Sequence, residues 1–343
     1  MSFKQAPPTQ ERSAYGTQVQ VSAAQPSDVR DFVAELPLHE WLLLGYLACL
    51  FLLAATSTAL HHDAAMVRTA ANLGVALVSV GLVRSRVLGH SRWEALVSRS
   101  MILVCLAVSF VQLTELFALR GSPNMDETLL RFDTSLFGFE PAVYADRWVT
   151  PALVDWFSFF YFGYYFLLAV HIFPIGYFSQ NTELAHEFAL GIVMTFCAGH
   201  LLYFAVPGLG PFSLPVFAHK LEGGYWWSLV SSTVQSAGAR KDIFPSLHTA
   251  VPTFISLFSF RRRHTAPFRY TWIPVSLFTS QIILATMFLR WHYVIDVVAG
   301  LSLAATTSFL AKRVSRWEAS RRDGFGLSLA LPTYSDSGRR QPS

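Results

Sequence analysis

Long runs of apolar residues, separated by short polar connections, make up most of the chain. Several runs exceed the ~18 residues that a helix needs to cross the hydrocarbon core of a bilayer. Because lipid cannot satisfy exposed backbone groups, these runs are predicted to be helices. The second and sixth have the weakest patterns, and each boundary carries a margin of about 4 residues. The predicted spans are residues 38–60, 67–83, 101–119, 152–176, 187–207, 246–260, 271–289 and 292–311.

The composition agrees with this pattern. Of the 343 residues, 52% are hydrophobic and only 14% are charged, whereas soluble domains average about a quarter charged. No soluble-sized insertion and no glycine-rich nucleotide-binding loop interrupts the runs. We therefore predict an all-α, polytopic membrane helix bundle of about eight spans. Its parts are a disordered tail (1–37), two N-terminal spans (38–99), a six-span membrane domain (100–312) and a basic tail (313–343).

Basic residues set the expected orientation. Lys and Arg concentrate within residues 84–99, 261–269 and 312–322, and eight spans place all three segments on one side with both termini. Since Lys and Arg in short loops favour the cytoplasm, both tails are predicted to be cytoplasmic. The net charge of +4 is modest and the basic residues adjoin apolar runs, so no nucleic-acid partner is expected.

The opposite side receives two long connections, residues 120–151 and 208–245. The first alternates apolar and charged residues, which predicts a helix lying in the membrane interface, with a solvated loop as the alternative. The aromatic run 156–166 is interpreted mostly as a lipid-facing belt. The alternative is that this run lines a groove for a lipid substrate.

Two short motifs carry the candidate chemistry. Pro245-Ser246-Leu247-His248 opens the sixth predicted span, and Arg290-Trp291-His292-Tyr293-Val294-Ile295-Asp296 opens the eighth. The two crossings between them, at about 20 residues each, return the chain to the same face. Both motifs are therefore predicted to lie together at helix N-termini on the extracytoplasmic face.

These residue types favour an anionic ligand. Helix N-termini present free N–H groups and the positive end of the helix dipole to a phosphate. Pro245 suits a first helical turn, and Ser246 can cap the helix or donate to phosphate. His292 and Asp296 share a helix face, so Asp296 can hold one ring nitrogen and leave the other as nucleophile or base. Arg290 supplies a planar fork that matches phosphate.

Other polar groups have simpler structural interpretations. An isolated His–Asp pair is often only a structural hydrogen bond. Tyr203, His200 and Glu115 are candidate pocket residues, although mutual pairing of His200 with Glu115 is the preferred interpretation. A zinc site from the histidines and Asp296 is conceivable in geometry, but no HExxH motif or cysteine cluster supports it. No metal or other cofactor is expected.

At these motifs the chain resembles the type 2 phosphatidic acid phosphatase superfamily. The forms Ser-Leu-His and His-Tyr-x-x-Asp-Val-x-Ala-Gly are most similar to its inositol phosphorylceramide synthase-like branch, and the resemblance covers roughly residues 100–312. It implies a six-helix lipid-phosphatase-like catalytic core in which His292 forms a phosphohistidine. It further implies that Asp296 orients His292, that His248 protonates the leaving group and that Ser246 contacts phosphate.

The basic motifs of the broader family are missing. No Lys-x6-Arg-Pro precedes the first motif; the nearest stretch, residues 203–211, resembles the Gly-Pro element of the sphingolipid-synthase branch without its following Arg. The family's Ser-Arg pair falls on Ala285-Thr286. Arg290 is therefore the expected substitute, and Arg240 and Lys241 are further phosphate-binding candidates. The alternative, given equal weight, is that Arg240 and Lys241 belong to a charged loop without function.

Three functions remain in competition. A transferase moves a phosphoalcohol headgroup or phosphate from one membrane lipid to another through a phosphohistidine, as the inositolphosphotransferase-like motifs favour. A hydrolase releases phosphate from phosphatidate or a polyprenyl diphosphate to water. A lipid or anion transporter, or a scaffold, is the non-enzymatic alternative, because broken helices also serve transport. Membrane lipids are the expected partners in each case, and no obligate protein partner is inferred.

Overall fold

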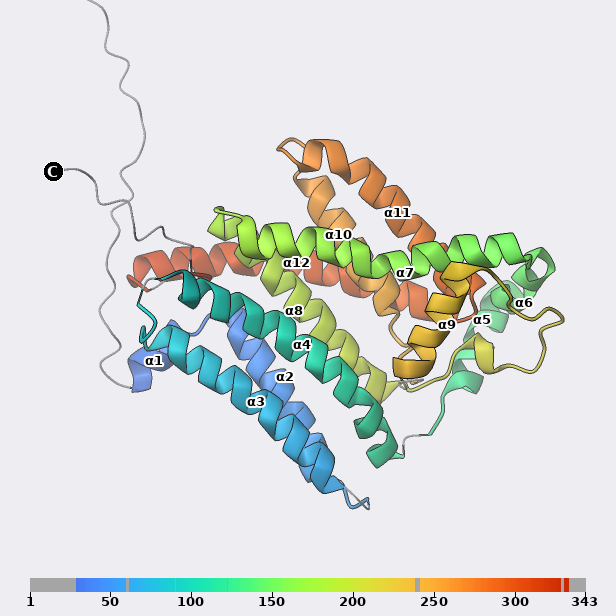
Figure 1. Ribbon diagram of the computed structural model, residues 1–343, viewed down its shortest axis with the longest axis horizontal. Helices are drawn as coiled ribbons and strands as arrows, with labels where there is room; N and C mark the ends of the chain where they lie inside the picture. The colour runs from blue at the N-terminus through green and yellow to red at the C-terminus, as the bar shows by residue number, and fades with distance from the viewer. Residues whose placement is uncertain are drawn as a thin grey trace, which may run out of the picture.

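The computed structural model describes residues 29–59, 62–89, 91–121, 123–237, 241–327 and 330–332, and within these it is helical without strands. The long helices form one bundle, and the short helices α5, α6 and α9 gather at one end of it (Figure 1). The helices are α1 (Val29–Glu35), α2 (Leu38–Ala55), α3 (His62–Arg84), α4 (Arg92–Arg120), α5 (Asp126–Phe137), α6 (Pro141–Ala145), α7 (Pro151–Phe173), α8 (Thr182–Ala205), α9 (Tyr225–Ala237), α10 (Leu247–Arg261), α11 (Phe268–Phe288) and α12 (Val294–Gly324).

Seven described helices are long and apolar enough to cross a membrane: α2, α3, α4, α7 with its continuation to Phe178, α8, α11 and α12. The sixth predicted span corresponds to α10, whose 15 residues cover only about 22 Å at 1.5 Å per residue. Helix α10 lies among α8, α11 and α12, and Phe254, Ile255 and Phe258 on it are fully buried. The prediction of a polytopic membrane helix bundle is confirmed.

Several boundaries differ from the predicted ones. Helix α12 continues through residue 324, well past the predicted end at 311, because its polar last turns pack on the start of α2. Helix α1 occupies the last part of the predicted N-terminal tail. The remainder of that tail, residues 1–28, and residues 333–343 of the predicted C-terminal tail lie outside the described residues.

The predicted helix between spans three and four is present as α5. It is amphipathic: Leu129 and Asp133 are buried, Phe132 and Leu136 are exposed beside them, and the charged residues Glu127 and Arg131 are exposed on the other face. The solvated-loop alternative is therefore wrong. The depth of α5 in a membrane stays a prediction.

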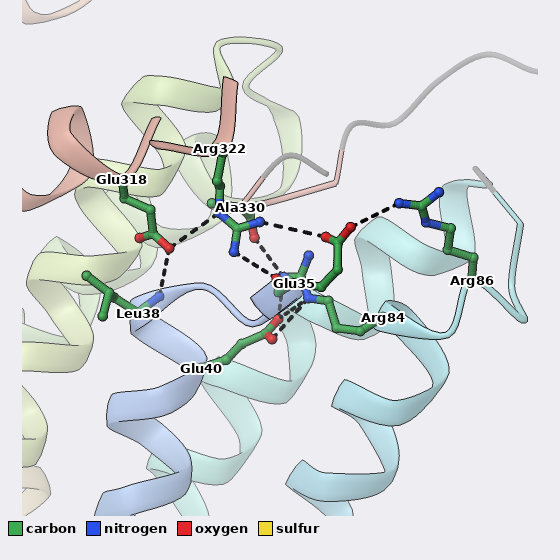
Figure 2. A network of polar contacts seen from close by, with 8 residues as sticks. All are labelled: Glu35, Leu38, Glu40, Arg84, Arg86, Glu318, Arg322 and Ala330. Carbon is green, nitrogen blue, oxygen red and sulfur yellow. Dashed lines mark hydrogen bonds and ion pairs between the residues drawn. The ribbon is translucent and has the colours of Figure 1, made fainter. Parts of the chain in front are cut away.

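A buried polar network fastens the bundle at the end away from α5, α6 and α9 (Figures 1 and 2). Arg84 at the end of α3 forms an ion pair with Glu40 at the start of α2, at 2.5 Å, and donates to the carbonyl of Ala330 at 2.9 Å. Glu318 near the end of α12 accepts from the Leu38 N–H at 2.9 Å. The segments around residues 84 and 312–322 therefore meet at one end of the bundle, as their predicted common side requires.

Candidate active site

A largely apolar cavity of about 710 Å³ lies between α4, α7 and α8. Helix α8 passes between α4 and α7 (Figure 1), and each of the three contributes a stripe of residues at helical spacing. Around His248 and His292 the wall is completed by α9, by the turn at residues 209–213 and by residues 242–243. The stripe from α8 consists of Ala185, Phe188, Ala189, Ile192, Phe196, His200 and Tyr203.

The two motif histidines lie on the wall of this one cavity. Helix α10, which carries His248, and helix α12, which begins just after His292, start side by side. The Ser246 N–H donates to the Asp296 carbonyl at 3.0 Å and joins the two starts. A tight packing contact maintains this approach: a Cβ on Gly300 would lie 2.6 Å from the Ser246 carbonyl oxygen. The spacing argument thus places the motifs correctly relative to each other.

The His292 ring is held against Asp296. Its Nδ1 lies 3.5 Å from Asp296 Oδ2, and that oxygen accepts the Tyr293 N–H at 2.9 Å. The side chains of His292 and Asp296 are 5% and 0% exposed, so water does not compete for the carboxylate. A contact slightly longer than a hydrogen bond is common in enzymes without substrate and tightens on binding. With Nδ1 facing Asp296, Nε2 is the nitrogen left for chemistry.

His248 packs against aromatic rings of α7. It stacks on Tyr161 with centroids 4.2 Å apart and planes 10° apart, and its centroid lies 4.3 Å from that of Tyr164. Its Nε2 is buried and has no hydrogen-bond partner among the described residues. The aromatic run 156–166 therefore does more than face lipid, because Tyr161, Phe162, Tyr164 and Tyr165 line the cavity. These four residues line a cavity, as the groove alternative required; that the cavity binds a lipid substrate stays a prediction.

The helix N-termini are occupied by protein groups. The buried carboxylate of Asp133 on α5 accepts from the first N–H groups of α12, those of Val294 at 2.6 Å and Ile295 at 3.1 Å. Ser246 caps α10 and accepts from the Thr249 N–H at 3.2 Å. The cap at Ser246 was predicted, but Pro245 precedes it and so lies outside the first helical turn. These N–H groups are not open to a phosphate in this structure.

Arg290 does not line the cavity. Its guanidinium donates to Asp146 at 2.5 Å and to the His219 carbonyl at 2.8 Å, and it stacks 3.8 Å from the centre of the Phe217 ring. Burial lowers the pKa of Arg290, and the Asp146 carboxylate opposes this shift. Arg290 has a φ of 64°, in the left-handed region, within the turn from α11 to α12. The structure therefore shows Arg290 as a brace for this turn.

Gly210, in the Gly-Pro stretch, packs tightly against the backbone just before His292. Its φ of +84° suits glycine, and a Cβ there would lie 2.3 Å from the Trp291 carbonyl oxygen. Asp126 on α5 accepts the N–H groups of Leu209 and Gly210, both at 2.7 Å. Asp126 thus fixes the turn at 209–213 against the residues that immediately precede His292.

The remaining candidates divide into lining and distant residues. Tyr203 and His200 line the cavity, and His200 Nδ1 lies 2.7 Å from the Tyr46 hydroxyl. Glu115 pairs with Arg68 instead, so the expected pairing of His200 with Glu115 is wrong. Lys241 adjoins the cavity-lining Asp242. Arg240 lies outside the described residues.

Asp242 is the cavity residue that the sequence interpretation missed. Burial raises its pKa to about 6, and nearby His292 acts in the opposite direction. A carboxylate four positions before Ser246 is a weak signal in a loop, since no periodicity assigns it to a wall. It adds a second acidic group beside His292.

The protein is a multi-pass helical membrane protein, and two histidines line its largely apolar cavity. One of these histidines contacts a carboxylate. This arrangement fits the class of lipid-acting phosphoryl-transfer enzymes. The family model of the PAP2 superfamily matches residues 127–310, more than half of the chain, so the chain belongs to the PAP2 superfamily. Members of this superfamily are typically phosphatases or phosphotransferases. No curated protein and no solved structure matches the chain. The match begins in α5 and leaves α1 to α4 outside it.

Proposed function

We propose that this protein transfers phosphoryl groups of membrane lipids through a phosphohistidine on His292. The observation that carries the proposal is the placement of His292 and His248 on one cavity wall, with Asp296 at 3.5 Å from His292 Nδ1. An oriented imidazole beside a second histidine supplies both a nucleophile and a general acid.

In the first step, His292 Nε2 attacks phosphorus, the P–N bond forms and the bond from phosphorus to the leaving oxygen breaks. Protonated His248 donates its proton to that oxygen, and Asp296 holds the Nδ1–H of the reacting imidazole. In the second step, an acceptor hydroxyl attacks the phosphohistidine. His248, now neutral, takes the acceptor's proton as the P–N bond breaks.

The phosphate oxygens need a positive partner in this scheme. We propose four candidates for this role: Ser246, Arg290, Arg240 and Lys241. Arg290 pairs with Asp146 and Ser246 caps α10, so both would have to change partners on substrate binding. Lys241 is adjacent in sequence to the cavity-lining Asp242. Replacing Lys241 with Gln is expected to raise KM for a lipid phosphate more than it lowers kcat.

The preferred reaction is transfer of a phosphoalcohol headgroup, similar to inositol phosphotransfer. The lining of the same cavity includes the hydroxyl and amide side chains of Ser213, Ser231, Thr233 and Gln235. Such groups hydrogen-bond a hydroxyl-rich headgroup and would be superfluous for a bare phosphate. The acceptor is then a second lipid, and the site is proposed to face the extracytoplasmic side with both termini in the cytoplasm.

Hydrolysis of a lipid phosphate is the second candidate. One continuous cavity contains both histidines, and a single lipid beside an activated water satisfies the same two steps. Purified protein incubated with phosphatidylinositol, phosphatidate and a polyisoprenyl diphosphate, with ceramide as acceptor, separates the two reactions. A new phosphoinositol lipid supports transfer; release of inorganic phosphate without headgroup exchange overturns the transferase assignment.

A further inference from the structure

The cavity extends far beyond the space that the two histidines need. On α8 its wall runs from Ala185 to Tyr203, and at 1.5 Å per residue this covers about 27 Å. The hydrocarbon core of a bilayer is about 30 Å thick, so the chains of one leaflet fill about 15 Å. The groove is therefore nearly as long as the whole core is thick.

The groove is open along its side and closed at the end away from the histidines. Helix α4 packs against α8, whereas α7 packs closely against neither of them. Tyr165 and Phe173, which line the groove on α7, are 43% and 49% exposed. This leaves a lateral opening toward lipid through which a chain can enter.

Polar contacts close the far end. Arg99 on α4 donates to the Gly176 carbonyl at 2.5 Å and to the Pro332 carbonyl at 2.8 Å. Leu331, only 2% exposed, completes the wall there. The neighbouring Ala330 is fixed by Arg84 within the network of Figure 2. A hydrocarbon chain that starts at His292 therefore meets a fixed stop near Arg99.

We infer that this groove binds one hydrocarbon chain of the lipid substrate, longer than one leaflet is deep, and selects substrates by that length. The inference rests on the proposed function, since the phosphate end of the chain must lie at His292. One wall comes from α4, which lies outside the residues matched by the family model. The ligand is therefore a long apolar hydrocarbon chain, and both an isoprenoid chain and a very long acyl chain fit this description. Chains that end at the bilayer midplane leave the half near Arg99 unfilled.

Photo-crosslinking tests occupancy without turnover. The probe is a polyisoprenyl phosphonate, which has no cleavable phosphate ester, with a diazirine on its terminal isoprene unit. Labelling of wild-type protein is expected in the peptides around Arg99 and residues 172–177. A very-long-chain ceramide phosphonate with a terminal diazirine, tested in parallel, distinguishes the two chain types. Absence of far-end labelling with both probes overturns the inference.

Paired variants test selection by length. Ala169 lines the groove on α7, about 12 Å along the helix from Tyr161, whereas its neighbour Val170 is 61% exposed and does not line the groove. Ala169→Trp should lower the ratio of kcat/KM for polyisoprenyl phosphate over dibutyryl phosphatidate by on the order of tenfold, because a bulky side chain overpacks the groove. Val170→Trp should keep the wild-type ratio.

A second pair on the opposite wall guards against a folding defect in Ala169→Trp. Ala107 lines the groove on α4, and the neighbouring Val108 is 39% exposed without lining it. Equal ratios in the lining and control variants of both pairs would contradict selection by length. Far-end labelling in a protein that turns over no lipid would leave the groove standing and refute the proposed function alone.

Discussion

Asp133 is predicted to control the position of His292 from a distant helix. It lies on α5 and accepts from the N–H groups of Val294 and Ile295, 161 and 162 residues further along the chain. Its side chain is fully buried. Because α12 begins two residues after His292, these two hydrogen bonds fix the start of the helix that carries Asp296 and directly follows the candidate nucleophile.

The cost of removing Asp133 can be worked from these contacts. Asp133→Ala leaves two backbone N–H groups without an acceptor, at about 1–3 kcal/mol each. Loss of the buried carboxylate offsets part of this cost, because burial disfavours its charged form. Burial raises the pKa of Asp133, although the two backbone hydrogen bonds lower it. A net loss of about 2–3 kcal/mol of unfolding free energy is expected. A shift of about 1 Å at His292 would also lower kcat by up to about a hundredfold.

The assay combines unfolding in mixed micelles with phosphate-transfer rates. Glu127→Ala is the matched control, because Glu127 lies on the same helix, is 81% exposed and pairs only with Arg131, a contact worth about 0.3–0.5 kcal/mol. Asp133→Asn, which keeps one acceptor oxygen, should fall between the two. If Asp133→Ala matches Glu127→Ala in stability and rate, another contact positions the start of α12.

Three further predictions concern the cavity and its support. With a pKa of about 6, Asp242 gains negative charge as pH rises through 6 and repels phosphate; KM for a phosphodiester lipid should rise there in wild type and stay flat in Asp242→Asn. Tyr161→Leu removes the ring stacked on His248 and should lower kcat by up to about tenfold, since such contacts contribute about 0.5–1.5 kcal/mol; an unchanged pH profile of kcat would contradict a positioning role. Arg290→Ala should cost about 1.5–3 kcal/mol of unfolding free energy by removing the charged hydrogen bond to Asp146, which keeps its contacts with Ala218 and His219; a raised KM at unchanged stability would instead make Arg290 a phosphate ligand.

The bundle and the meeting of the two motifs were predictable from local sequence. Apolar runs of span length determine membrane helices, and the distance from His248 to His292 matches two crossings, so a hairpin had to bring the motifs together. Helix α10 lies where the sixth span was predicted, but with 15 residues it is not among the helices long and apolar enough to cross a membrane. The pairing of His292 with Asp296 was also predicted, but its geometry was not: His292 precedes the cap residue Tyr293, so the contact is made across the start of α12 and not along one helix face.

The partners of the site residues were not predictable in the same way. Asp146 neutralises Arg290 from 144 residues earlier in the chain, and Asp133 occupies the α12 N-terminus from α5. Both acids lie in a connection whose apolar and charged alternation indicates a helix but no contact. Asp242 was not predicted as a site residue, because it too lies in a connection whose contacts the local pattern does not indicate. Local patterns predict elements and spacing, whereas these roles depend on how a loop folds over the bundle.

The central claim is tested most directly by trapping the covalent intermediate. Purified protein is mixed with a phospholipid labelled at phosphorus, quenched in alkali, in which a P–N bond survives, and digested for peptide mapping. The account predicts label on the peptide containing His292 in wild type and none in His292→Ala. Label that persists in His292→Ala, or turnover of labelled lipid by that variant at the wild-type rate, would contradict the account.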